Sequence, residues 1–111
     1  MVGGDVKVTV VRGAGLSGMV RRSELDSGTL PPREQEELLE LLEAAGLAQA
    51  QGADATPAHA DEMAYEIQVE GVGEPIVARF TESSLPAGSR ALMGWVAAHP
   101  ATRSRLAPPG H

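Results

Sequence analysis

One order of segments occurs twice along this chain, and the repetition constrains the fold more than any other feature of the sequence. Each half contains two extended segments, then a short Leu-Pro signal, and then an amphipathic helical stretch. The signals are Thr-Leu-Pro at residues 29–31 and Ser-Leu-Pro at residues 84–86. Because successive extended segments separated by glycine-rich turns favour antiparallel hairpins, the sequence predicts the order ββαββα.

The extended segments are indicated by alternation of apolar and polar residues. In residues 6–11 the alternate valines fall on one face, which predicts a half-buried strand. Residues 19–25 are compatible with a second strand that has one solvated side, or with a short helix. Residues 63–69 alternate again, and a further run over residues 76–80 follows a Gly-Val-Gly turn, so we expect a second hairpin there.

Two stretches have the apolar spacing and the end signals of helices. In the first, Pro31 and Pro32 suit a first helical turn, leucines recur between residues 38 and 42, and Gly46 is a stop signal. The second stretch follows Pro86 and ends before residue 100, which is also a proline. Its apolar face contains Leu92, Trp95, Val96 and His99. We interpret this face, including the tryptophan, as core packing.

Two amphipathic helices are enough to cover one face of a four-stranded sheet, and a chain of 111 residues forms one small domain. We therefore expect a two-layer α+β fold, with a four-stranded antiparallel sheet of two hairpins and two helices packed on it. The expected domain comprises residues 5–99. Residues 1–4 are expected to be a flexible N-terminus, and residues 100–111 a flexible C-terminal tail.

The amino-acid composition excludes several classes of function. The sequence has no cysteine, which excludes disulfides, thiolate zinc sites and thiol nucleophiles. It has no apolar stretch of the roughly 18 residues that a membrane helix needs, and it begins without the basic and apolar regions of a secretory signal, so we expect a cytoplasmic protein with no membrane partner. The net charge of -6 opposes phosphate backbones. A protein or neutral partner is expected rather than nucleic acid.

The glycines at residues 13–18 match the pattern G-x-G-x-x-G directly after a predicted strand. A dinucleotide-binding turn also needs a helix that opens at the third glycine, and a parallel strand that ends in an acid about twenty residues on. That position falls inside the leucine-rich helix. We therefore predict a glycine-rich hairpin loop instead.

No residues have the arrangement of a catalytic or metal site. The acids Glu36, Glu40 and Glu43 lie opposite the leucines, as expected for the solvated face of an amphipathic helix. The histidines are dispersed and lack zinc-binding spacing, and His99 is explained by a helix C-terminus. No serine has the surroundings of a nucleophile. The sequence predicts a protein that is not an enzyme and that has no cofactor or metal of its own.

Two segments stand out as candidate binding sites. Leu16 is apolar at a predicted hairpin tip, so it either folds back over the sheet edge or is exposed for binding. Residues 47–61 form a long connection of small side chains, and such connections are usually mobile or functional. Within it His59 lies between Asp54 and Asp61. It is either a solvated loop histidine or a residue that meets a partner's metal.

Several short motifs occur in a fixed order over residues 6–97. The first half has the opening strand, Gly-Leu-Ser-Gly at 15–18, Arg-Arg at 21–22, Leu-Asp at 25–26, and Leu-Pro-Pro at 30–32 before the helix rich in glutamate and leucine. The second half has Tyr-Glu-Ile-Gln-Val at 65–69, Leu-Pro at 85–86, Leu92, and Trp-Val at 95–96. This order resembles the emfourin family, small proteinaceous inhibitors of protealysin-like metalloproteases of the thermolysin family. The middle loop is the least similar part.

The resemblance implies a bacterial, cytoplasmic, monomeric protein that blocks the cleft of a thermolysin-like zinc protease by loop insertion. Such proteases favour a bulky apolar side chain just after the scissile bond, which Leu16 or Met19 would supply. The candidate protease-binding residues are Gly15, Leu16, Ser17, Gly18 and Met19 in the first loop, and Asp54, Ala55, Thr56, Pro57 and His59 in the second. The acidic net charge predicts that a basic rim on the protease would speed association. The alternative is a non-inhibitory interaction module or small-ligand carrier.

Overall fold

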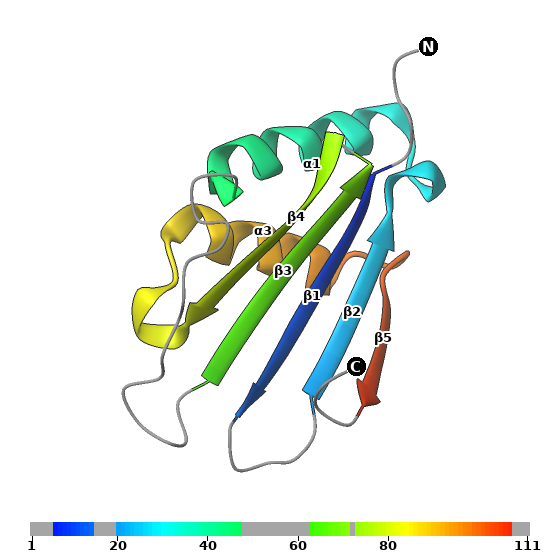
Figure 1. The fold of residues 1–111 in the computed structure, drawn as a ribbon. Helices are drawn as coiled ribbons and strands as arrows, with labels where there is room; N and C mark the ends of the chain where they lie inside the picture. Colours follow the sequence, from blue (N-terminus) through cyan, green and yellow to red (C-terminus); the bar gives the residue numbers. More distant parts are fainter. Residues whose placement is uncertain (1–5, 15–19, 48–62, 72, 108–111) are drawn as a thin grey trace.

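A computed structural model describes residues 6–14, 20–47, 63–71 and 73–107 of the chain. Within these residues one antiparallel sheet has the strand order β4-β3-β1-β2-β5, and two helices cover one of its faces (Figure 1). The strands are β1 (Lys7–Ala14), β2 (Val20–Asp26), β3 (Met63–Gly71), β4 (Gly73–Thr81) and β5 (Arg103–Ala107). The helices are α1 (Pro32–Ala45) and α3 (Ala87–Ala98), and the short 3-10 turns η1 (Ser27–Thr29) and η2 (Glu82–Ser84) precede them.

The α+β architecture of two hairpins and two helices is confirmed, but the expected number of strands is wrong. The described residues form five strands, because residues 103–107, which we assigned to a flexible tail, pair with β2 as β5. Val20 lies opposite Ala107, and the Oγ atoms of Ser23 and Ser104 are 3.0 Å apart. Backbone pairing with β2 satisfies one side of a segment that has only one large apolar residue.

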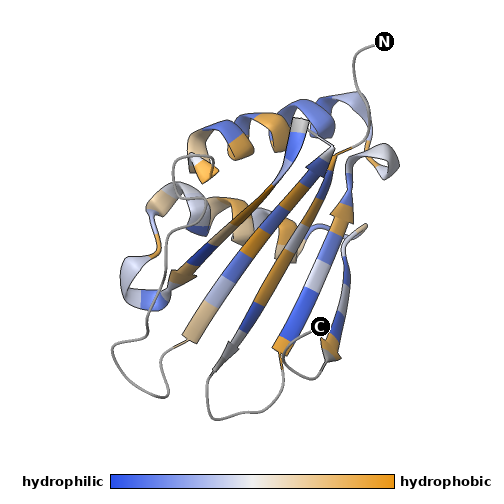
Figure 2. Ribbon diagram, viewed as in Figure 1, coloured by the Kyte–Doolittle hydropathy of each residue, from blue (hydrophilic) through white to orange (hydrophobic). Residues whose placement is uncertain are grey.

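The core lies between the sheet and the helices. Alternate residues of β1, including Val8 and Val10, face the helices and are buried. Their cross-strand neighbours on β2 and β3 are also buried, and all except Ser23 are apolar; Leu38 of α1 and Leu92 of α3 close the core from the other layer. Figure 2 shows the corresponding alternation of apolar and polar residues along the strands. Each fully buried leucine contributes about 1.5–3 kcal/mol through removal of apolar surface from water.

Helix α1 begins and ends at the residues whose types predict these boundaries. Pro31 is the N-cap and Pro32 is the first helical residue, where a missing N–H leaves no helical hydrogen bond unmade. The Nε2 group of Gln35 donates to the carbonyl oxygen atoms of Ser27 and Leu30, at 3.0 and 2.9 Å, and so fixes the turn that leads into the helix. Gly46 ends the helix in the left-handed conformation, with φ of 61°.

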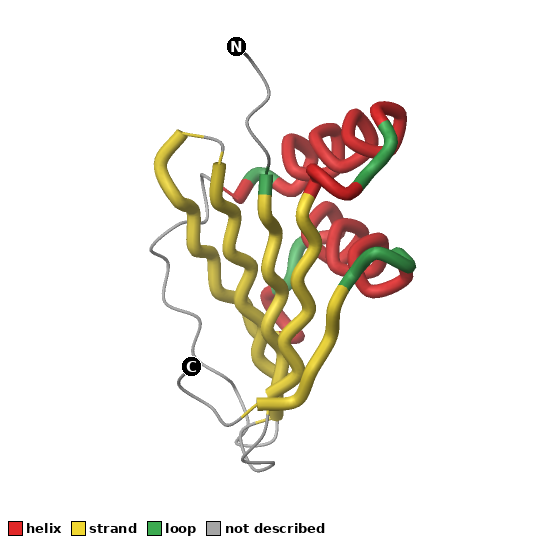
Figure 3. Tube along the Cα trace, turned by 90° about the vertical axis from the view of Figure 1, so that its right-hand side faces the viewer, coloured by secondary structure: helices red, strands yellow, loops and turns green. Residues whose placement is uncertain are grey.

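The two helices run antiparallel and approach each other closely. The first turn of α1 contacts the end of α3 through a hydrogen bond between Glu34 and His99. At the other end, a Cβ atom on Gly88 would lie 2.5 Å from the carbonyl oxygen of Ala44, so only glycine fits there without movement of the backbone. In Figure 3 the helices lie beside the upper and middle parts of the sheet, and the ends of the strands continue below them.

The segment after α3 turns the chain back into the sheet. His99 caps α3, and its Nδ1 atom accepts a hydrogen bond of 3.0 Å from the backbone N–H of Ala101. Thr102 donates its hydroxyl to the carbonyl oxygen of Val96 and its backbone N–H to that of His99. These bonds direct the chain into β5. No helix among the described residues is long and apolar enough to cross a membrane.

Candidate functional site

The ten predicted protease-binding residues, Gly15 to Met19 and five residues between Asp54 and His59, lie outside the residues that the structure describes. The strands that border both segments are described. Strand β1 ends at Ala14, β2 begins at Val20, and β3 begins at Met63, whose Cα partner is Ala14. We call this the lower end of the sheet, as oriented in Figure 1. The chain therefore enters or leaves both candidate segments at one end of one sheet.

The lower end belongs to the most extensively paired part of the sheet. Strand β1 is central, and its register is continuous with β2 from Lys7 to Arg12 and with β3 from Lys7 to Ala14. On the helix side Val10 and Ile67 are buried and anchor these strands to the core. A segment attached to such strands begins from fixed ends, which reduces the ordering cost when it binds.

The glycine-rich motif lies between antiparallel strands. Val10 of β1 pairs with Ser23 of β2, and Lys7 pairs with Asp26, as in a hairpin. A dinucleotide fingerprint requires a crossover to a parallel strand, so this pairing excludes it. The predicted hairpin is confirmed in the strands on both sides of the motif.

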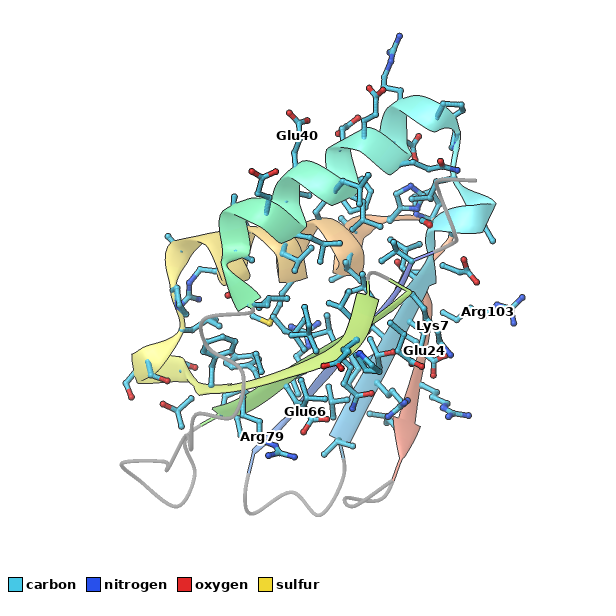
Figure 4. The ribbon with its side chains drawn as sticks, turned by 45° about the horizontal axis from the view of Figure 1, so that its top comes forward. Lys7, Glu24, Glu40, Glu66, Arg79 and Arg103 are labelled. Atoms are coloured by element: carbon cyan, nitrogen blue, oxygen red, sulfur yellow. The ribbon has the colours of Figure 1, made fainter. Side chains whose placement is uncertain are left out.

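The face of the sheet that the helices leave open carries a network of charges. The Oε1 atom of Glu24 lies 3.1 Å from Lys7 Nζ, and its Oε2 atom lies 3.0 Å from Arg22 Nε. Hydrogen bonds from Lys7 and then from Arg22 lower the pKa of the Glu24 carboxyl, and partial burial opposes them. A second pair joins Arg79 Nε to Glu66 Oε1 at 2.9 Å. Figure 4 shows these two groups on the open face.

The acids of α1 occupy its solvated side, as predicted. Glu36, Glu40 and Glu43 are exposed, and Glu40 projects away from the sheet (Figure 4). No group of three histidine, aspartate or glutamate side chains is close enough to hold a metal within the described ranges.

Sequence reasoning missed the role of His99. Its ring lies 5.1 Å from the half-buried ring of Trp95, and its Nε2 atom contacts a carboxylate oxygen of Glu34, which is 65 residues away. With Nδ1 accepting from the backbone, Nε2 is the atom that donates to Glu34. A shallow depression lies beside these residues, and two of its polar residues, Glu34 and His99, join the two helices. The available signals were an acid in the first turn of one helix and a histidine after the last turn of the other.

Comparison with known proteins places the chain in one family. A family model, Emfourin, matches residues 12–97, from the last residues of β1 to the last residues of α3. The match spans both candidate segments. No curated protein and no solved structure matches the chain. On the strength of the family match, which covers more than half of its length, the chain belongs to the emfourin family, whose members are known as protease inhibitors.

Proposed function

We propose that this protein inhibits a thermolysin-like, protealysin-like zinc metalloprotease by inserting a loop into its active-site cleft. The observation that carries the proposal is the emfourin match over residues 12–97, which includes both candidate segments, strands β2 and β3, and the end of β1. The pairing of Ala14 with Met63 supports it, since it attaches both segments to the same end of the sheet. The protein acts as a monomer in the cytoplasm and protects the cell that makes the protease.

In this proposal the first loop is the inserted element. Leu16, with Met19 beside it, fills the protease pocket that receives the residue after the scissile bond. The strands on either side support such a role, because β1 and β2 hold the residues next to the loop in a paired register up to Arg12 and Arg21. Affinity then comes from a preorganised loop rather than from a large interface.

The second segment lies across the cleft, with Asp54 or His59 near the zinc of the protease. This contact is compatible with the first, because β3 begins beside the end of β1. The two loops are distinguished by comparing Leu16→Ala with deletion of residues 54–59. If the first loop fills the pocket, Leu16→Ala causes the larger loss of inhibition; if the second loop blocks the zinc, the deletion does.

The experiment that tests the proposal is titration of the purified protein into thermolysin and into a protealysin-like enzyme during hydrolysis of a fluorogenic peptide. We expect stoichiometric loss of activity that added zinc does not restore. Leu16→Ala should weaken inhibition at least tenfold, roughly the effect of removing a central apolar anchor, and leave the thermal unfolding curve unchanged. Full activity of both enzymes at excess protein would contradict inhibition and favour a non-inhibitory interaction module.

A further inference from the structure

The charges of this acidic protein are unevenly distributed over the fold. Six of its nine lysine and arginine residues lie on three adjacent strands, β1, β2 and β5: Lys7, Arg12, Arg21, Arg22, Arg103 and Arg105. The acids gather elsewhere, with five glutamates on α1 alone: Glu34, Glu36, Glu37, Glu40 and Glu43. These three strands carry six basic residues against two acids, Glu24 and Asp26, so their local charge is opposite in sign to the net charge of -6. An approaching partner meets a local field of the opposite sign there.

One row of side chains crosses these three strands at the lower end of the sheet. Arg12 of β1 lies opposite Arg21 of β2, and Arg21 lies opposite Leu106 of β5. Because cross-strand partners share a face, all three are on the helix side of the sheet. We call these three residues the arginine row.

The arginine row lies at the margin of helix α3. Arg12 borders a small cavity that Met93 and Ala97 of α3 form with Val10 and Ser23 of the neighbouring row. The arginine row itself is exposed: both arginines are accessible to solvent, and Leu106 is 60% exposed. The helix layer therefore stops short of this row.

The placement of two arginines opposite each other is unfavourable for the isolated fold. Like charges at directly opposed strand positions are destabilising, by a few tenths of a kcal/mol to about 1 kcal/mol. Neither Arg12 nor Arg21 forms an ion pair with another described residue, although the sequence contains fifteen acids. The stability of the fold gives no reason for this pair.

Protection of a sheet edge does not explain these two arginines either. Charged residues on an edge strand discourage pairing with other chains, and this accounts for Arg103 and Arg105 on β5. Strands β1 and β2 are interior strands, with neighbours on both sides. Arg12 and Arg21 therefore need another reason, and an external acidic partner supplies one.

We propose that the arginine row is a docking surface for an acidic rim beside the cleft of the target protease, with Leu106 packing on an apolar side chain within that rim. This inference rests on the proposed function, since the row lies at the end of the sheet from which both candidate loops extend. It replaces the basic rim expected from net charge alone. The positive row turns the loop-bearing end of an otherwise acidic inhibitor toward the protease, which raises the association rate.

The test compares two double variants with equal change in net charge. Arg12→Gln with Arg21→Gln removes both charges of the row. Arg33→Gln with Arg90→Gln removes two exposed arginines from α1 and α3, and serves as the matched control. Association rates are measured from inhibition progress curves with a protealysin-like enzyme, at low salt and at high salt, and stability from thermal unfolding.

We expect the row variant to associate about tenfold more slowly at low salt, and the difference to shrink at high salt because salt screens exposed charges. The control should change the rate by less than about twofold. The row variant should unfold at an equal or higher temperature, because a like-charge pair has been removed. Leu106→Ser should raise the dissociation rate with little dependence on salt, since it removes an apolar contact.

Three results would overturn the docking surface, and they differ in what they mean for the proposed function. If the wild-type protein inhibits and both double variants slow association equally, only net charge matters and the row is not a docking site, while the proposed function stands. If the row variant inhibits like wild type at low salt, the same conclusion holds. If the wild-type protein inhibits neither enzyme, the proposed function fails, and the inference that rests on it fails too.

Discussion

Polar and charged residues are arranged differently in the part of the sheet that the helices cover and at its uncovered lower end. In the covered part, Val6 and Ser27 exchange two hydrogen bonds of 2.8 Å, and Gln35 completes the turn beside them. At the lower end, Arg12 faces Arg21 and a leucine is exposed. Residue choices that are unfavourable for the stability of the fold usually occur where a protein binds a partner. This contrast is expected if the covered part maintains the fold and the lower end, as proposed, serves binding.

The largest expected effect is a difference in the free energy of unfolding between substitutions of two glycines in helix α3. Gly88→Ala places a methyl group 2.5 Å from a backbone oxygen of α1, whereas a methyl group on Gly94 meets nothing within 4 Å. We expect Gly88→Ala to lower the free energy of unfolding by about 2 kcal/mol through overpacking. Gly94→Ala should raise it by about 1 kcal/mol through helix propensity. Urea unfolding of the two variants measures the difference, and equal values would show that the helices do not depend on this close approach.

A second effect tests whether the covered part is independent of binding. Ser27→Ala removes the hydroxyl that accepts a hydrogen bond from the buried backbone N–H of Val6. A buried donor without a partner should lower the free energy of unfolding by about 2 kcal/mol. Inhibition measured well below the unfolding transition should remain that of wild type. Weaker inhibition by the folded variant would mean that the two parts of the sheet are coupled.

A smaller effect concerns the charge network on the open face. Glu24→Gln removes the carboxylate held by Lys7 and Arg22, and should lower the free energy of unfolding at pH 7 by about 1 kcal/mol. Because the folded state lowers the pKa of Glu24, its stabilisation is present above the ordinary glutamate pKa and is lost as pH falls through the lower folded-state value. Wild type and variant should therefore converge in acid. A difference that persists at pH 2 would assign the effect to packing instead.

Sequence patterns that act over a few residues predicted most of the fold. Features that depend on strand register or on pairing with a distant segment were not predicted. Alternation indicated the hairpins, and the prolines before α1 and the glycine after it marked that helix, because these preferences act over a few residues. Strand β5 was missed because a five-residue segment with two arginines is a strand only through pairing with β2. Its remaining signal was the alternation of arginines with Ser104 and Leu106.

Among the candidate binding residues, too, some could be recognised from the sequence and others could not. Leu16 was recognisable from its glycine neighbours alone, and its role remains a prediction. The arginine row was not recognisable, since nothing in the sequence places Arg12 opposite Arg21 or brings Leu106 beside them. The pair at residues 21–22 was part of the family resemblance, but its surroundings depend on the register of three strands. Binding residues that act as a row therefore need the structure, whereas a single apolar residue in a loop does not.

The smallest expected effect is the sharpest test of the contrast between the covered part of the sheet and its lower end. In this test, stability and inhibition should change in opposite directions. Arg21→Thr replaces a charge facing Arg12 with a residue that favours strands, so the free energy of unfolding should rise by about 0.5 kcal/mol. Inhibition should nevertheless weaken, since the arginine row loses a charge. Arg79→Thr is the matched control: it removes a strand arginine that has Glu66 as its partner, so stability should fall slightly and inhibition should not change. If Arg21→Thr lowers stability and inhibition together, Arg21 supports the fold and the lower end is not specialised for binding.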